Sequence, residues 1–239
     1  MKTQAILLSL IMFMVLLFSC SEDTITASDE VTSKNYEYND YTALEINDNF
    51  KVFLTFSDTE ENFEVKANTN LHQYIKITQS GNKITVKLDG VGQIRGNEIL
   101  QIYITTQEIT DINLKGNTNL TVEELVNPTN VNIELTGNCF LSGSVNIEQM
   151  NLKATGNCMI DLSGNVGSLD AKLVGNCQLT DYYLTIDALK INLSGNSNAQ
   201  LTVDTSISID GSGNSILYYK GNPSIIHQNL SSNSKLIRN

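Results

Sequence analysis

A Gly-Asn pair recurs through the second half of this chain, and its spacing constrains the fold more than any other feature of the 239 residues. Apolar or small residues return two and four positions before each glycine and four positions after it, with mostly polar residues between. This alternation on both sides of a corner is typical of short strands that bury one face. Glycine and asparagine reach positive φ at low cost, so each pair marks a bend. The pairs begin at Gly116, Gly137, Gly156, Gly175, Gly195 and Gly213.

The regular recurrence favours stacked coils over a series of hairpins. One such pair could equally join two antiparallel strands, but here the same corner and the same inward positions return every 18 to 21 residues. The simplest packing lays each coil on the last, with parallel strands about 4.8 Å apart. We therefore predict an all-β chain in which residues 111–239 form a right-handed parallel β-helix, or a related solenoid, of about six coils and a closing segment. Gly96-Asn97 fits the spacing as a candidate degenerate first coil.

Two positions of the repeat predict ladders of like side chains along the stack. Each corner asparagine should hydrogen-bond to its copy in the next coil. The position two after the glycine is always small, and three successive copies of it are cysteine. We interpret these as buried small thiols and not as a metal or redox site, since no histidine is near in sequence and in-register thiols suit a disulfide poorly. The predicted ladders are Asn117, Asn138, Asn157, Asn176, Asn196 and Asn214, and Cys139, Cys158 and Cys177.

Residues 41–110 show a different strand pattern. Several alternating runs precede residue 81, and Gly81-Asn82-Lys83 predicts a hairpin leading into residues 84–88. This segment is either a small separate β-domain or a cap over the first coil, because the open end of a solenoid must be covered.

The N-terminus predicts export and lipid anchoring. Residues 1–19 carry one lysine and then an apolar run that is short for a transmembrane helix, which is typical of a secretory signal. Leu17-Phe18-Ser19-Cys20 resembles a lipobox, so Cys20 is the predicted site of lipid attachment and of membrane association. Residues 20–40 are polar at first and are predicted to be a flexible tether. The acidic residues after Cys20 resemble the surface-export signals of Bacteroidetes lipoproteins, so we expect an outer-membrane lipoprotein, displayed on the cell surface in preference to the periplasm.

The order of these elements resembles that of a known family, the "putative auto-transporter adhesins" with a head GIN domain. The resemblance covers about residues 40 to 220 and implies an all-β, helix-like stack on the envelope of Bacteroidetes, in a domain of unknown function. No terminal segment resembles a membrane translocator, so lipid anchoring replaces self-secretion here. Besides the leader and the Gly-Asn coils, the segments that carry the resemblance are Asn49 to Thr55, Val65 to Asn68, Leu71 to Lys76 and Gly81 to Val86.

Composition narrows the choice of partner. The formal net charge of −11 repels phosphate backbones, so nucleic acid is excluded as a partner. We expect a surface binding or adhesion module with a glycan or protein partner; the alternative is a structural or sensory envelope protein that binds another protein. A polysaccharide-active enzyme is disfavoured because the outward acids of the coils do not recur at one position and the chain has no Trp. No metal and no cofactor are predicted. Candidate contact residues are Phe140, Met159, Tyr182, Tyr183, Tyr218 and Tyr219.

Overall fold

The computed structural model describes residues 24–126 and 129–239. The predicted leader over residues 1–19 and the predicted lipid site at Cys20 lie outside the described residues. Within them, no helix is long and apolar enough to cross a membrane.

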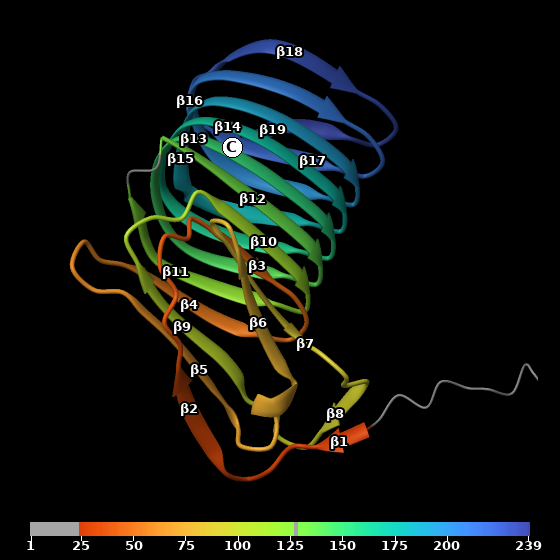
Figure 1. Cartoon of the computed structure of the whole chain (residues 1–239). Helices are drawn as coiled ribbons and strands as arrows, with labels where there is room; N and C mark the ends of the chain where they lie inside the picture. Colours follow the sequence, from red (N-terminus) through yellow and green to blue (C-terminus); the bar gives the residue numbers. More distant parts are fainter. Residues whose placement is uncertain (1–23, 127–128) are drawn as a thin grey trace, which may run out of the picture.

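The predicted parallel β-solenoid is confirmed, with about seven turns in place of about six. In each coil, the strand before the Gly-Asn corner and the strand after it stack in parallel on their copies in the next coil (Figure 1). The register is that of the sequence repeat, because Gly137 pairs with Gly156, and Gly156 with Gly175. The strands of this region are β10 (Asp111–Gly116), β11 (Asn119–Val126), β12 (Asn130–Gly137), β13 (Phe140–Gly156), β14 (Met159–Gly175), β15 (Gln178–Gly195), β16 (Asn198–Gly211), β17 (Ile216–Lys220), β18 (Ser224–Leu230) and β19 (Lys235–Arg238).

Close stacking at the corners explains the glycines. Gly156 has a φ of +109°, and a Cβ placed on it would lie 2.4 Å from the carbonyl oxygen of Gly137. The next amide along, that of Asn157, donates to this same oxygen at 2.8 Å. A side chain at the glycine would therefore push two coils apart and break the bond that holds them together.

The corner asparagines form one hydrogen-bonded ladder along the rod. Each side-chain Nδ2 donates to the Oδ1 of the preceding asparagine, with N···O distances from 2.7 to 3.0 Å. The ladder is longer than the repeat, since it begins on Asn49 and ends on Asn233. We call this set the asparagine ladder: Asn49, Asn117, Asn138, Asn157, Asn176, Asn196, Asn214 and Asn233.

The small residue two after each glycine closes the corner from inside. Thr118 Oγ1 donates to the carbonyl oxygen three residues earlier at 2.8 Å, and Ser197 Oγ does the same at 3.0 Å. The thiols of Cys158 and Cys177 make the equivalent contact at 3.6 and 3.4 Å. Besides being small, the side chains of this column therefore share a second property: they donate to the carbonyl oxygen three residues earlier and close the corner.

The N-terminal segment supplies the first coil, and its strands are interleaved with the later ones. Strands β3 (Ala43–Ile46) and β4 (Lys51–Phe56) pair in parallel with β10 and β11 on one side. On the other side they pair in parallel with β7 (Lys83–Leu88) and β9 (Leu100–Thr106). One continuous apolar core extends from Tyr41 to Leu217, so residues 41–110 share both sheet and core with the coils.

The first corner is Asp48-Asn49, and the interpretation of Gly96-Asn97 as a degenerate first coil is wrong. Asp48 reaches a φ of 72° without being glycine, and its Oδ2 accepts the Leu88 N–H at 2.7 Å. Gly96-Asn97 instead follows β8 (Gln93–Arg95), which pairs with β1 (Thr24–Thr26) at the base of the rod.

The predicted flexible tether over residues 20–40 is wrong for its described part, residues 24–40. Strand β2 (Val31–Asn35) pairs antiparallel with β5 (Asn62–Asn68), which itself pairs antiparallel with β9. Because β2 is an edge strand with little buried surface, its composition is polar like that of a linker. The predicted hairpin is confirmed: β6 (Ile75–Ser80), which follows the short 3₁₀ helix η1 (His72–Tyr74), pairs antiparallel with β7.

Candidate binding surface

The strands that precede the corner present a polar outer face. Their outward side chains come from β3, β10 and β12 and from the second halves of β13 to β16, stacked in rows by the parallel register. This polar face, which we define by these strands, alternates Asn, Asp, Glu and Lys while the intervening residues fill the core.

A cleft of about 210 Å³ lies on the polar face where the N-terminal segment meets the coils. Each level of the stacked strands is called a rung. The cleft spans four successive rungs, since its lining comes from β3, β10, β12 and β13, with one lysine from β7. The lining residues are Ala43, Leu44, Glu45, Lys83, Asp111, Ile112, Asn113, Asn132, Ile133, Glu134, Asn151 and Lys153.

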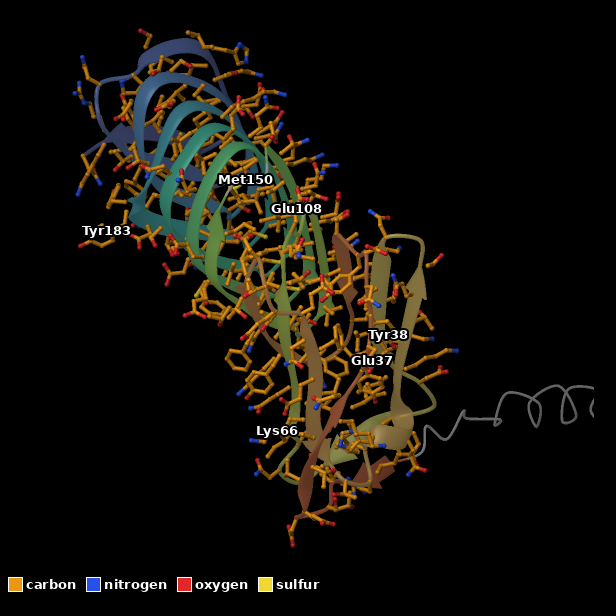
Figure 2. The ribbon with its side chains drawn as sticks, turned by 60° about the vertical axis from the view of Figure 1, so that its left-hand side comes forward. Glu37, Tyr38, Lys66, Glu108, Met150 and Tyr183 are labelled. Carbon is orange, nitrogen blue, oxygen red and sulfur yellow. The ribbon has the colours of Figure 1, made fainter. Side chains whose placement is uncertain are left out.

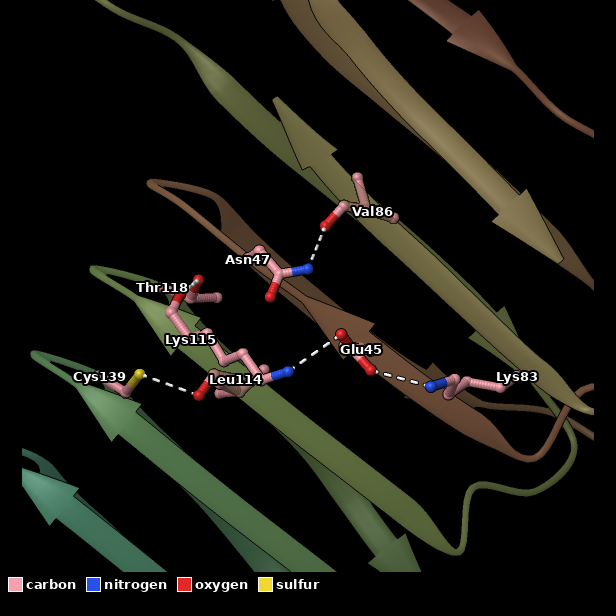
Figure 3. A network of polar contacts seen from close by, with 8 residues as sticks. All are labelled: Glu45, Asn47, Lys83, Val86, Leu114, Lys115, Thr118 and Cys139. Atoms are coloured by element: carbon pink, nitrogen blue, oxygen red, sulfur yellow. Dashed lines mark hydrogen bonds and ion pairs between the residues drawn. The ribbon is translucent and has the colours of Figure 1, made fainter. Parts of the chain in front are cut away.

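Glu45 is held between two lysines at the edge of this cleft (Figure 3). Its Oε2 lies 2.9 Å from Lys83 Nζ and its Oε1 lies 3.0 Å from Lys115 Nζ. The Glu45 side chain is only 18% exposed, and the hydrogen bond from Lys83, helped by that from Lys115, lowers its pKa below the ordinary value in spite of burial. This carboxylate therefore stays ionised at neutral pH, which suits an acceptor and not a proton donor.

Neighbouring rungs fix the other polar groups of the cleft. Asp111 accepts from Asn132 Nδ2 at 2.9 Å and from Thr110 Oγ1 at 2.8 Å. Asn151 Nδ2 in turn donates to Asn132 Oδ1 at 3.0 Å. The cleft thus offers pre-oriented carboxylate, amide and ammonium groups, which can exchange hydrogen bonds with a ligand rich in hydroxyls.

Phe140 and Met159 lie side by side on a different face. They are paired in register at the start of β13 and β14, with outward side chains. Phe140 is half-buried, whereas Met159 is 46% exposed. Lower on the same face, Phe53 and Tyr103 stack with ring centroids 4.9 Å apart, a pair that we did not single out from the sequence.

The four candidate tyrosines do not gather with Phe140 and Met159. Tyr183 is 80% exposed and points away from the rod (Figure 2), whereas Tyr219 packs against the core. Tyr182 is half-buried, with Lys220 Nζ 4.2 Å from its ring centroid and Asn239 Nδ2 donating to its hydroxyl. Tyr218 on β17 lies two rungs beyond Thr180, so it stands two residues along the strand from the row of Met159 and Gln178.

The three cysteines are free and buried inside the rod. Hydrogen bonding to the neighbouring thiol and burial raise the pKa of Cys158 and of Cys177, so these thiols stay protonated at neutral pH. Among the described residues, no group of His, Cys, Asp and Glu side chains is placed to hold a metal ion.

The sequence matches one protein family over most of its length. Residues 40–223 match the family described as "Putative auto-transporter adhesin, head GIN domain". No curated protein matches the sequence.

Several solved structures share the fold. A "putative adhesin" from Bacteroides fragilis has a TM-score of 0.77 and 18% identity, with 90% of this chain and 97% of that chain covered. A "putative adhesin" from Parabacteroides merdae has a TM-score of 0.66 and 15% identity, with 90% and 99% covered. A "putative lipid binding protein" from Parabacteroides distasonis has a TM-score of 0.66 and 13% identity, with 90% and 99% covered. At these identities the likeness shows a common fold.

Proposed function

The chain belongs to this family of "putative auto-transporter adhesins", and from that premise we propose that it is a lipid-anchored, surface-displayed binding module of the cell envelope without catalytic activity. Lipid attached at Cys20 holds the protein to the outer membrane, and the solenoid presents its faces to a partner. The family name supports adhesion, and the lipobox-like residues before Cys20 support the anchor.

The polar cleft around Glu45 is the observation that carries the proposal. Its acceptors and donors are fixed by neighbours on stacked strands, so little side-chain entropy is lost when a ligand binds. Polyhydroxylated ligands match this chemistry, and a glycan is therefore the proposed ligand class. An inverting or retaining glycosidase needs one carboxyl that is protonated at working pH, and the two lysines beside Glu45 oppose that state.

Glycan-array binding of a soluble form starting at Ser21 tests the ligand class. Every residue of the apolar core lies after Ser21, so this form retains the fold. We expect Asn132→Ala, which empties the centre of the cleft, to weaken glycan binding about tenfold. Thr180→Ala, a change of similar size on another face, should leave binding unchanged. Equal binding by both variants, or release of reducing ends from the bound glycan, would contradict the proposal.

A protein partner is the second candidate, favoured by the exposed Met159 and Tyr183 side chains. Methionine and tyrosine are enriched at protein interfaces. Affinity for a purified surface partner should then fall in Met159→Ser and stay unchanged in Asn132→Ala.

Two experiments test the anchor and the side of the membrane. Cys20→Ser should remove incorporation of radioactive palmitate and release the protein from membranes. Protease treatment of intact cells should degrade the wild-type protein without lysis if it is displayed outside.

A further inference from the structure

The end of the rod farthest from β1 is formed by β18 and β19 (Figure 1). Strand β18 pairs with β16, and β19 pairs with β17. Within the described parts of the chain, no strand pairs with the outer edge of either. We call the outer edges of β18 and β19 the distal edge.

The hydrogen-bonding direction of the distal edge follows from its contacts with the coil below. The Ser231 N–H donates to the Gly211 carbonyl oxygen at 2.9 Å, toward the rod. Since successive residues of a strand direct their peptide groups to opposite sides, Gln228 and Leu230 direct theirs away from it. In β19 the Lys235 N–H donates to the Ser215 carbonyl oxygen at 2.9 Å, so the peptide groups of Lys235 face the rod. Those of Leu236 and Arg238, one and three residues later, therefore point outward. The register of β18 with β16 shifts at Ile226, and from His227 to Leu230 the outward groups form a template for one more strand.

Apolar side chains accompany this open template. Ile226 is 69% exposed and Ile225 is 39% exposed, on a strand whose residues from 224 to 229 are all exposed. The opposite end of the rod is different, because antiparallel strands β2, β5 and β6 continue the sheets there and polar residues dominate the edge strand β2. Only the distal end thus combines an unpaired parallel edge with exposed isoleucines in the described residues.

The distal end is also basic on an acidic chain. The last rung, residues 224–239, contains Lys235 and Arg238 and no Asp or Glu, whereas the whole chain has 26 acidic and 15 basic side chains. Asp210 of the rung below already accepts hydrogen bonds from Asn229 and His227 of β18. A negatively charged partner is therefore attracted to this end and repelled by the rest of the rod.

We propose that the distal edge is a docking site for an acidic, extended peptide segment of a partner protein, which adds a strand to β18. Backbone pairing requires a peptide, because neither a glycan nor a lipid headgroup supplies alternating N–H and C=O groups at strand spacing. Alternate apolar side chains of that segment cover Ile226, and the carboxylate at its end beside Leu230 approaches Lys235, the first residue of β19 after the corner. A second copy of this chain is disfavoured as the occupant, since tip-to-tip contact would bring the same cations together. The proposal goes beyond the proposed function, because it uses neither the cleft nor the lipid.

Fluorescence anisotropy with the form starting at Ser21 tests the pairing. Three labelled probes suffice: the peptide Glu-Val-Glu-Val-Glu-Val-Glu, the same peptide with lysine for glutamate, and the acidic peptide with its central valine replaced by proline. We expect the first to bind at least about tenfold more tightly than either of the others, and more weakly as salt rises. Equal binding of the proline peptide would overturn the proposal, because charge alone would then explain the affinity; equal binding of the lysine peptide, or no binding, would also overturn it.

Pairs of matched variants test whether the acidic peptide binds at the distal edge. Gln228→Pro removes an outward N–H and should abolish binding of the acidic peptide, whereas Gln228→Thr keeps the N–H and should bind as wild type. Lys235→Glu should weaken binding about tenfold, and Lys172→Glu, the same charge change on the polar face, should have little effect. A peptide-insensitive dimer that Gln228→Pro dissociates would overturn the proposal in favour of a second copy. Glycan binding by these variants separates the failure of this inference from that of the proposed function.

Discussion

Replacing a corner glycine by alanine tests how closely the coils stack. In Gly156→Ala the new Cβ lies 2.4 Å from the Gly137 carbonyl oxygen, at a φ of +109°. The positive φ alone costs about 1–2 kcal/mol for an L-residue. Relief of the contact requires the two coils to move apart, which weakens the bond from the Asn157 N–H to the same oxygen. We expect a total loss of roughly 3 kcal/mol in the free energy of unfolding.

Gly81→Ala is the matched control for the backbone conformation. Gly81 has a φ of +59° at the β6–β7 hairpin, and no atom lies within 4 Å of a Cβ built there. Its expected loss is only about 1 kcal/mol. Urea unfolding followed by far-UV circular dichroism gives both values. Equal losses in the two variants would refute the idea that the carbonyl of the coil below excludes a side chain.

Three further predictions concern the ladder, the ion pairs and the thiols. Asn157→Ala removes two ladder bonds and should destabilise the protein by about 1–3 kcal/mol, whereas Asn233→Ala removes one exposed bond and should cost less; equal losses in urea titrations would contradict this. Because the lysines lower the pKa of Glu45, they stabilise the fold above the unfolded pKa of about 4.3 and lose that effect as pH falls through the lower folded pKa. Glu45→Gln should therefore lower the melting temperature at pH 7 and differ less from wild type at pH 3, and a difference that grows toward pH 3 would disprove the sign. The three buried cysteines should react with Ellman's reagent only at the rate of global unfolding, so rapid reaction of the native protein would show that they are accessible.

The repeat could be predicted from sequence because one constraint acts at every corner. Each coil needs a residue without Cβ where it meets the carbonyl below, and an amide side chain beside it, so Gly-Asn appears at fixed intervals. The corners at the two ends of the rod depart from this pattern. Asp48 and Ser232 adopt φ values of 72° and 59° in place of glycine, so neither the first nor the last corner shows the Gly-Asn signal.

The interleaving of the N-terminal strands could not be read from sequence. Alternation identified the strands themselves, but it does not say that β3 and β4 lie between β7 and β9 on one side and β10 and β11 on the other. That order depends on which strand edges pair with one another, and this pairing is decided only when the whole sheet folds. For the same reason Glu45 and Lys83 were not singled out, since they become part of a cleft only when their strands meet the coils.

Strand β18 also had no signal in the sequence. It carries His227, whose Nε2 lies 3.2 Å from Asp210 Oδ1 on the rung below. The signal was hidden because β18 is exposed on both faces and shows no apolar alternation.

Nuclear Overhauser contacts in solution test most directly whether residues one Gly-Asn interval apart lie over each other. The fold predicts contacts between the side-chain amides of Asn138, Asn157 and Asn176, and between the backbone amide of Asn157 and Gly137, in a parallel pattern. Antiparallel contacts between the strands that flank one Gly-Asn pair, with no contact between successive asparagines, would show that the corners are hairpins and that the chain does not form a solenoid.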